Sequence, residues 1–220
     1  MNIVNPVISS YTDGFYRPLN DELGKLRAQG EEEHVPIILR ETETFLRPIT
    51  EMRKPEKVLE IGCAIGYSAS FFASACDCSV TTVEADEGMF NTAKANIAGL
   101  GLSDRIRVIH GDGIKVLEEL SPDEDGLYDM VFIDAAKSHY RSFWDRALPL
   151  CSDGALIICD NILMKGMTAS DEFDTRGRYK TSMRRMREFL EYIGSIPYGE
   201  TYVLPVGDGI SLSIIDKEKI

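Results

Sequence analysis

Hydrophobic and polar positions follow two periods in turn from residue 57 onward. Short apolar runs rich in β-branched residues are followed by stretches whose apolar residues recur every three or four positions. The first pattern predicts buried strands and the second predicts amphipathic helices. The predicted strands are Lys57–Ile61, Ser79–Glu84, Arg105–His110, Tyr128–Asp134 and Gly154–Asp160. The predicted helices are Tyr67–Ala75, Glu87–Leu100, Ile114–Leu120 and His139–Leu148.

This alternation of strands and helices predicts the fold class. Parallel strands joined by crossover helices form a doubly wound α/β sheet. Near the end of the chain, the strand-like runs Thr201–Val206 and Ile210–Asp216 are separated by Gly207-Asp-Gly209, which is a hairpin signal. We therefore predict a Rossmann-like, seven-stranded sheet that is mostly parallel, with one antiparallel strand in the region of an edge.

The residues before 57 have helical patterns instead. Pro18–Gln29 is one predicted helix and Pro36–Met52 another, with Pro36 suited to a first turn. No repeat, low-complexity tract or proline-rich linker divides the chain. We expect a single domain over residues 1–220, with amino-terminal helices at 1–56 and the α/β core at 57–220.

Composition supports an ordinary globular protein. The chain has 220 residues, of which 44% are hydrophobic and 27% are charged, so it can bury a sizeable core. No apolar run approaches the roughly 20 residues that span a bilayer, and the start of the chain has no basic region followed by an apolar one. We expect a cytoplasmic protein without a membrane partner. The cysteines, which we expect to be reduced packing residues, are Cys63, Cys76, Cys78, Cys151 and Cys159.

A glycine-containing loop follows the first predicted strand, in the stretch Val58-Leu-Glu-Ile-Gly62-Cys-Ala-Ile-Gly66-Tyr-Ser68. Glycines at the carboxyl end of a strand allow a sharp turn and the close approach of a ligand. We therefore expect a nucleotide-like cofactor on this loop, although a turn without a ligand is the alternative. The spacing differs from Gly-x-Gly-x-x-Gly, which argues against a NAD-dependent oxidoreductase.

Acidic residues follow or end each predicted parallel strand, at Glu60, Glu84, Asp112, Asp134 and Asp160. Because ligands of open α/β sheets bind beyond the carboxyl ends of the strands, these side chains should converge on one crevice. Glu84 lies 24 residues after Glu60, near the offset at which a carboxylate accepts hydrogen bonds from a ribose. Asp112 could contact an adenine amino group, or Gly-Asp-Gly could be an ordinary turn.

The oxygen-bearing side chains of Asp134, Asp160 and Asn161 should lie at the ends of adjacent strands. Two carboxylates would repel each other there unless a cation neutralised them, and oxygen ligands suit magnesium. A substrate with two neighbouring oxygens could replace two of the waters on that ion, and the ion would activate a hydroxyl. The alternative is that these residues only cap the segments that follow them.

Together, these motifs resemble the metal-dependent O-methyltransferase family that includes catechol and caffeoyl-coenzyme A O-methyltransferases. The loop resembles motif I of class I S-adenosylmethionine-dependent methyltransferases. The other residues that carry the resemblance are Val131-Phe-Ile-Asp134-Ala-Ala-Lys137, the following Tyr140, and Ile158-Cys-Asp160-Asn161-Ile-Leu. The similarity covers nearly the whole chain.

The resemblance implies S-adenosylmethionine as methyl donor and Mg²⁺, or another divalent cation, as cofactor. The metal ligands that it implies are Asp134, Asp160 and Asn161, and the catalytic residues are Lys137, as general base, and Asp134. A lysine is a base only in its neutral form, which the nearby charges of magnesium and sulfonium both favour. The implied cofactor residues are Ile38 and Ser68 at the methionine end, Gly62 beside the cofactor backbone, Glu84 at the ribose, Asp112 and Gly113 at the adenine, and Asp134.

The net charge of −12 argues against a nucleic-acid partner, because phosphates are neutralised by Lys and Arg. One local segment differs, since residues 176–187 contain no acidic residue. Its basic residues are Arg176, Arg178, Lys180, Arg184, Arg185 and Arg187. This segment is either a cationic binding site or a solvated helical face balanced by nearby acidic residues.

Several features resemble a subgroup of the family, the bacterial enzymes that methylate 5-hydroxyuridine at the tRNA wobble position. They are Glu32-Glu-His34-Val-Pro36-Ile, Ile65-Gly-Tyr-Ser68-Ala, Lys165-Gly166, the arginine-rich segment and Pro205-Val-Gly-Asp-Gly209. In the arginine-rich segment the basic residues are more widely spaced than the resemblance to this subgroup implies.

We therefore expect methyl transfer to the 5-hydroxyl of 5-hydroxyuridine in tRNA, giving 5-methoxyuridine. The residues that we expect to contact tRNA are Arg176, Arg178, Lys180, Arg184 and Arg185. One alternative is the methylation of a small catechol-like or caffeoyl-CoA-like phenol. Another is a non-catalytic nucleotide-binding module. Because family members are often dimers, the resemblance also implies a homodimer.

Overall fold

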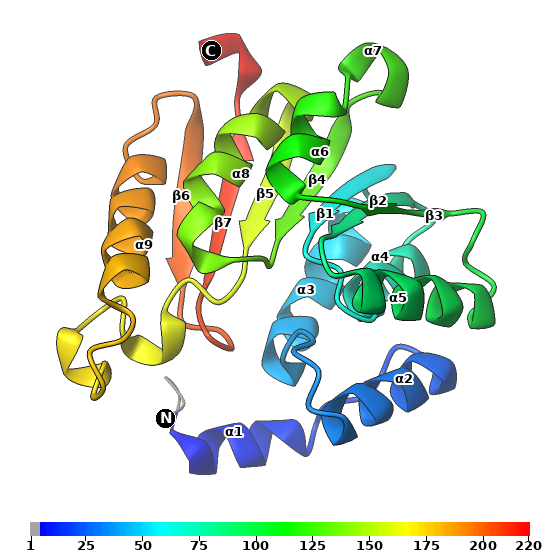
Figure 1. Ribbon diagram of the computed structural model, residues 1–220, viewed down its shortest axis with the longest axis horizontal. Coiled ribbons are helices and arrows are strands. Elements are labelled where there is room, and N and C mark those ends of the chain that lie inside the picture. The colour runs from blue at the N-terminus through cyan, green and yellow to red at the C-terminus, as the bar shows by residue number, and fades with distance from the viewer. Residues whose placement is uncertain (1–4) are drawn as a thin grey trace.

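The computed structural model describes residues 5–220, and its centre is a sheet with helices on both faces (Figure 1). Residues 1–4, part of the segment in which we looked for a targeting signal, lie outside the described residues. The seven strands have the order β3-β2-β1-β4-β5-β7-β6. Their bounds are β1 Lys57–Ile61, β2 Ser79–Glu84, β3 Ile106–His110, β4 Tyr128–Ile133, β5 Cys151–Cys159, β6 Gly199–Leu204 and β7 Ile210–Ile215.

The strand directions confirm the predicted fold class. Strands β1 to β5 pair in parallel, whereas β7 runs antiparallel to both of its neighbours, β5 and β6. The antiparallel strand is therefore second from the edge, and β6 forms the edge itself. The strand order reverses between β1 and β4, and a ligand crevice is expected beyond the carboxyl ends of the strands at such a point.

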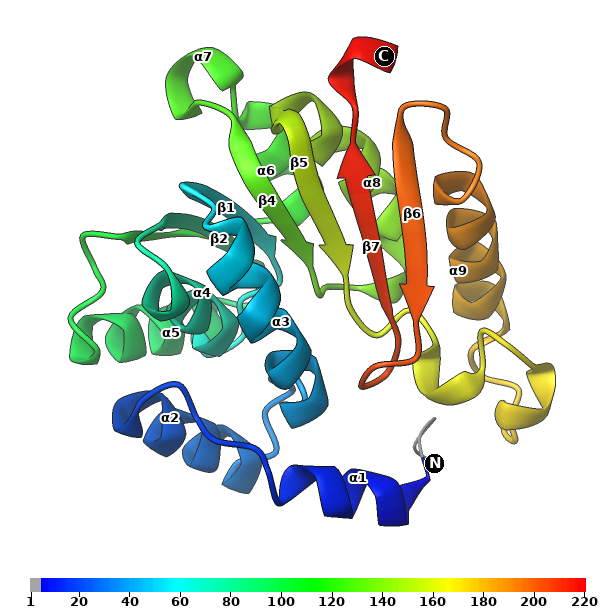
Figure 2. The same ribbon diagram turned by 180° about the vertical axis from the view of Figure 1, so that it is seen from behind.

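The helices lie in two layers that cover opposite faces of the sheet (Figures 1 and 2). Residues of α6, α8 and α9 join one hydrophobic cluster, and residues of α2, α3, α4 and α5 join the other. In α9 the buried residues Met183, Met186, Phe189 and Ile193 follow helical spacing. The bounds are α1 Pro6–Asp13, α2 Asp21–Glu32, α3 Arg40–Arg53, α4 Tyr67–Ala75, α5 Glu87–Gly99, α6 Gly113–Glu119, α7 Pro122–Asp125, α8 Tyr140–Ala147 and α9 Lys180–Ile193.

The amino-terminal helices differ from the prediction. Helix α1 was not predicted, and α2 begins at Asp21, where the side chain of Asn20 accepts a hydrogen bond from Leu23 N at 2.8 Å. Pro36 does not lie in a first turn, because α3 begins only at Arg40. The segment before α3 stays outside the helix, and its Ile38 carbonyl accepts a hydrogen bond from Arg27 Nη2 at 3.0 Å.

Two expectations from composition can be compared with the structure. Among the described residues, none of the helices is long and apolar enough to cross a membrane. All five cysteines are free, and four of them are buried, so they are packing residues as predicted.

Candidate active site

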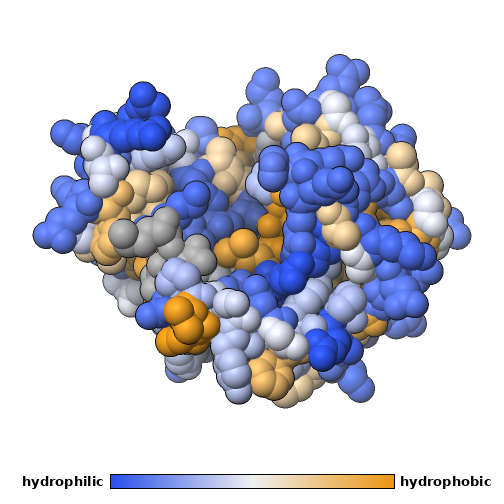
Figure 3. Space-filling model, turned by 90° about the horizontal axis from the view of Figure 1, so that it is seen from below, coloured by the Kyte–Doolittle hydropathy of each residue, from blue (hydrophilic) through white to orange (hydrophobic). Residues whose placement is uncertain are grey.

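A cavity of about 700 Å³ opens at the carboxyl ends of β1, β2 and β4, which is the size of a typical small-molecule site. Figure 3, which views this end of the molecule, shows a hollow with a hydrophobic floor and a hydrophilic rim. The cavity brings together most of the predicted site residues, namely Ile38, Gly62, Ser68, Glu84, Asp112, Gly113, Asp134, Lys137 and Asn161. Asp160 is not a lining residue: it is buried, and it directly precedes the lining residue Asn161.

The loop after β1 depends on Gly62 for a reason that the sequence did not show. Gly62 has φ +98°, and a Cβ added to it would overlap the carbonyl oxygen of Asp134. We expected this glycine to let a cofactor approach closely. The structure shows that the backbone of the neighbouring strand end already requires it, because no side chain fits between Gly62 and Asp134.

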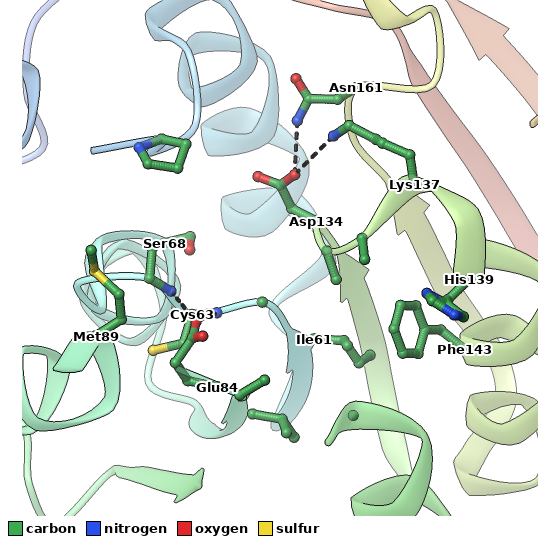
Figure 4. Close-up of a pocket in the computed structure, with 18 of the residues that line it drawn as sticks. Ile61, Cys63, Ser68, Glu84, Met89, Asp134, Lys137, His139, Phe143 and Asn161 are labelled. Carbon is green, nitrogen blue, oxygen red and sulfur yellow. Dashed lines mark hydrogen bonds and ion pairs between the residues drawn. The ribbon is translucent and has the colours of Figure 1, made fainter. Parts of the chain in front are cut away.

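Glu84, at the end of β2, holds the same loop in place. Its Oε2 accepts hydrogen bonds from the backbone of Cys63 at 3.2 Å and of Ala64 at 2.7 Å, and its Oε1 accepts one from Asp86 N at 2.9 Å (Figure 4). Carboxylate oxygens can each accept more than one hydrogen bond, so this side chain can also accept bonds from a ribose.

The side of the cavity around Asp112 and Gly113, where we expected the adenine, contains predicted and unpredicted residues. Asp112 is the N-cap of α6, and its Oδ1 accepts hydrogen bonds from Ile114 N and Lys115 N, both at 3.1 Å. A Cβ added to Gly113 would lie 3.0 Å from the ring of Phe143. Sequence reasoning missed Met89 and Phe143, which also line the cavity, because apolar residues at helical spacing look like ordinary core positions.

Asp134 and Asp160 leave adjacent strands at the same level. Backbone hydrogen bonds of 3.0 Å join Asp134 N to Ile61 O and Asp160 N to Ile133 O, which continues the parallel pairing past β4 and β5. Asn161 has φ +58°, and its Nδ2 donates to Asp134 Oδ1 at 2.8 Å (Figure 4). The three predicted metal-binding side chains therefore converge.

Asp160 has a buried carboxylate oxygen whose charge a cation would compensate. The side chain is 1% exposed, and its Oδ2 has no hydrogen-bond partner among residues 5–220. Burial, and next the charge of Asp134, raise the pKa of Asp160 well above its usual value. A nearby cation would reverse this effect by compensating both carboxylates. No three His, Cys, Asp or Glu side chains of residues 5–220 form a metal cluster, so the third oxygen donor would be the amide of Asn161.

Lys137 extends toward the same cluster from the short 3₁₀ helix that precedes α8. Its Nζ lies 3.7 Å from Asp134 Oδ1 and 5.8 Å from the ring centre of Tyr140. The Tyr140 hydroxyl in turn donates to the Asp160 carbonyl at 2.7 Å, which fixes the start of α8 against the end of β5. The side-chain nitrogen of Lys137 therefore lies beside Asp134, at the mouth of the proposed metal site.

The basic residues of the segment 176–187 have different surroundings. Arg176, Arg178 and Lys180 are exposed, at and before the start of α9. Arg185 lines a second cavity, of about 430 Å³, together with Lys137 and with other residues of the 3₁₀ helix and α8. Arg184 instead pairs with Glu188 at 3.0 Å and lines a different cavity. Arg185 thus adjoins the active-site crevice, and Arg184 does not.

A buried polar cluster that sequence reasoning missed supports the part of the cavity lined by Ile38 and Ser68. Arg27 Nη2 donates to Glu43 Oε2 at 2.5 Å and to the carbonyl of Ile38, and the Tyr67 hydroxyl donates to the same Glu43 oxygen at 2.6 Å. Tyr67 precedes Ser68, and Ile38 is a lining residue. The cluster therefore fixes α2 and α3 to the amino-terminal turn of α4 around the cofactor loop.

Glu60 is a buried carboxyl beneath this loop. Its burial leads us to predict that the free energy of unfolding of the protein depends on pH. Thr82 Oγ1 donates to its Oε2 at 2.5 Å, and burial raises its pKa from 4.5 to about 7. The folded protein therefore holds a proton that the unfolded chain releases between these values, so this group's contribution to stability falls as the pH rises from 4.5 to 7.

Glu60→Gln should remove this dependence, because glutamine does not ionise. Urea unfolding measures the free energy of unfolding of both proteins. Between pH 4.5 and pH 8, the free energy of unfolding of the variant should rise by about 3 kcal/mol relative to that of the wild type. A difference that stays constant over this range would show that Glu60 does not titrate as inferred.

The strand order, the glycine loop and the acidic strand ends define a class I S-adenosylmethionine-dependent methyltransferase. The O-methyltransferase family model matches residues 10–215, and the chain therefore belongs to this family.

Among its relatives, a caffeoyl-CoA O-methyltransferase of Stellaria longipes is 32% identical over 72% of this chain and 67% of the relative. A catechol O-methyltransferase of Niastella koreensis is 30% identical over 78% of each chain. A solved structure of a candidate caffeoyl-CoA O-methyltransferase from Staphylococcus aureus superposes with a TM-score of 0.87 at 32% identity, covering 95% of this chain and 99% of the other.

Proposed function

We propose that this enzyme transfers the methyl group of S-adenosylmethionine to a hydroxyl that has a second oxygen beside it, with a divalent cation held by Asp134, Asp160 and Asn161. The observation that carries this proposal is the buried, unpartnered Oδ2 of Asp160 next to a second carboxylate. A bound cation would supply the positive charge that lowers the pKa of the acceptor hydroxyl.

In this proposal the residues of the chain orient the reactants and accept the proton. Glu84 and the loop after β1 hold the methyl donor, and Lys137 removes the proton of the hydroxyl. The hydroxyl oxygen then forms a bond to the methyl carbon as the carbon–sulfur bond breaks, and S-adenosylhomocysteine leaves. The apolar lining, which includes Met89 and Phe143, keeps water away from the reacting atoms.

The first acceptor that we propose is a small catechol-like phenol. Two relatives at 30% identity or more carry the names of enzymes for catechol and for caffeoyl-CoA. Purified protein with radiolabelled S-adenosylmethionine and magnesium should convert a 3,4-dihydroxyphenyl compound to its monomethyl ether. If such phenols stay unmodified while tRNA that carries 5-hydroxyuridine is labelled, the second acceptor replaces the first. Labelling of neither would contradict the proposed acceptor chemistry.

The second acceptor is the 5-hydroxyl of 5-hydroxyuridine in tRNA, whose neighbouring carbonyl is the second oxygen. The observation that favours it is the position of Arg185 beside Lys137, on a protein with a net charge of −12. An acidic protein repels RNA over most of its surface, so a tRNA substrate needs a local cationic surface near the crevice. Arg176, Arg178 and Lys180 would extend this surface along the chain.

Arg185 and Arg184 form a matched pair of variants for the tRNA hypothesis. Arg185→Glu should lower the methylation of hydroxylated tRNA about tenfold, because it replaces an attraction to phosphate by a repulsion on the order of 1–2 kcal/mol. Arg184→Glu should change the rate little, since Arg184 lines a different cavity and already pairs with Glu188. Initial rates at several salt concentrations provide the measurement. Equal rates for both variants and the wild type at low salt would exclude a role of α9 in tRNA binding.

A further inference from the structure

The segment that follows the metal-binding side chains has an unusual backbone. Asn161, Met164 and Lys165 have φ values of +58°, +50° and +57°, so three residues without glycine's freedom are left-handed within five positions. Each left-handed residue of this kind costs on the order of 1 kcal/mol, so neighbouring structure has to hold the segment in this conformation. We call residues 161–165 the ligand loop, because it begins with Asn161.

The hairpin between β6 and β7 supplies the hydrogen bonds that hold the ligand loop. Ile162 N donates to Gly209 O at 3.0 Å, and Leu163 N donates to Asp208 O at 2.9 Å. In Figures 1 and 2 the hairpin lies beside the chain that leaves β5. Gly209 packs closely on this loop, because a Cβ added to it would overlap the side chain of Leu163.

One side chain of the hairpin takes part in this contact. Asp208 Oδ1 accepts a hydrogen bond from Lys165 N at 2.5 Å, although the two residues lie 43 positions apart. Lys165 is itself left-handed, and its side chain is exposed, so the contact fixes the backbone rather than the side chain. Asp208 lies close enough to Asp134 and Asp160 for the charges to affect one another, but its Oδ1 is occupied by the bond from the loop backbone.

We propose that Asp208 is a positioning residue that holds the ligand loop, and with it Asn161, in the geometry that binds the cation. This inference rests on the metal site of the proposed function. Asn161 is the proposed metal ligand that a change in the conformation of the ligand loop would displace most, since its left-handed backbone aims the amide toward Asp134. Residues that orient metal ligands typically contribute about 10- to 100-fold in metal affinity.

The test uses Mn²⁺ as the probe and measures its binding to the purified full chain by electron paramagnetic resonance. Asp208→Ala removes the acceptor and should weaken Mn²⁺ binding about 10- to 100-fold. Asp208→Asn keeps an oxygen that can accept from Lys165 N, so its affinity should return close to that of the wild type. Asp153→Ala is the matched control, because Asp153 Oδ1 accepts from the distant Lys217 N at 2.9 Å at the other end of the sheet.

Hydrogen exchange of the ligand-loop amides in metal-free protein adds an independent measurement. Exchange should accelerate in Asp208→Ala, stay slow in Asp208→Asn, and not change in Asp153→Ala. Equal Mn²⁺ affinity and equal exchange for wild type and Asp208→Ala would overturn the inference. So would a loss in Asp208→Asn as large as in Asp208→Ala, because the charge and not the hydrogen bond would then be responsible. A wild type that binds no Mn²⁺ would instead refute the metal site of the proposed function, and with it the role of Asp208 in metal binding.

Discussion

Asp160→Ala is expected to abolish methyl transfer while the protein stays folded and keeps its affinity for S-adenosylmethionine. The Oδ2 of Asp160 is buried and has no hydrogen-bond partner among residues 5–220, whereas its Oδ1 accepts a bond from Asn161 N at 2.7 Å. The variant therefore removes the proposed metal ligand and one local backbone contact. We expect turnover to fall on the order of 1000-fold or more, because several kcal/mol of charge stabilisation in the transition state disappear. Initial rates, calorimetric titration with the cofactor and a thermal unfolding curve measure the three quantities.

The metal dependence of methyl transfer can also be tested on the wild-type protein. Turnover should vanish when EDTA removes divalent cations and should return when magnesium is added in excess. Asp153→Ala, a variant of an exposed aspartate far from the crevice, should behave as the wild type does in both conditions. Full activity in EDTA would contradict the proposed metal site. If the Asp160→Ala protein does not fold, the EDTA experiment alone tests the site.

The parallel core could be predicted closely from sequence because its signal is local. Lys57–Ile61 and Ser79–Glu84 have the predicted bounds. The first is a mostly apolar and buried run, and the second alternates and is rich in β-branched residues. The convergence of acidic strand ends could also be predicted, because parallel strands of one sheet end at the same edge. Asp134 and Asn161 accordingly lie 2.8 Å apart through their side chains.

The amino-terminal part could not be predicted as well, because distant contacts override local preference there. Pro36 suits the first turn of a helix, but the carbonyl of Ile38 bonds to Arg27, and α3 starts after it at Arg40. Arg27 and Glu43 look like surface charges in the sequence. They are buried because they form a charged hydrogen bond with each other. The two residues lie 16 positions apart in the sequence, and helical periodicity does not predict a contact between them.

The ligand loop marks a second limit of sequence reasoning. Gly207-Asp-Gly209 was recognised as a hairpin signal, and the chain does turn there. The function of its aspartate depends on a contact with Lys165, which belongs to another connection on the same end of the sheet. Such a contact follows from the strand order β5-β7-β6, which the sequence pattern alone does not determine.

Glu84→Ala should weaken the binding of S-adenosylmethionine by on the order of 2–4 kcal/mol, or roughly 30- to 1000-fold in the dissociation constant. The variant loses charge-assisted hydrogen bonds to the ribose, and it also releases the backbone of Cys63 and Ala64 in the loop after β1. Calorimetric titration measures the effect. Glu87→Ala is the control, because Glu87 is an exposed carboxylate in the first turn of α5, three residues further along the chain.

A cofactor analogue without ribose hydroxyls separates the two contributions of Glu84. If Glu84 accepts hydrogen bonds from the ribose, the wild type should bind the analogue much more weakly than the natural cofactor, and Glu84→Ala should hardly distinguish the two. Each protein gives a ratio of the dissociation constants of the analogue and the natural cofactor. The coupling energy of the contact is RT times the logarithm of the wild-type ratio divided by the variant ratio, and the loosening of the loop cancels from it. A coupling energy near zero would mean that Glu84 stabilises the loop after β1 and does not contact the ribose. Unchanged affinity in a folded Glu84→Ala protein would remove it from the cofactor site, and tight binding of NAD by the wild type would favour a dehydrogenase instead.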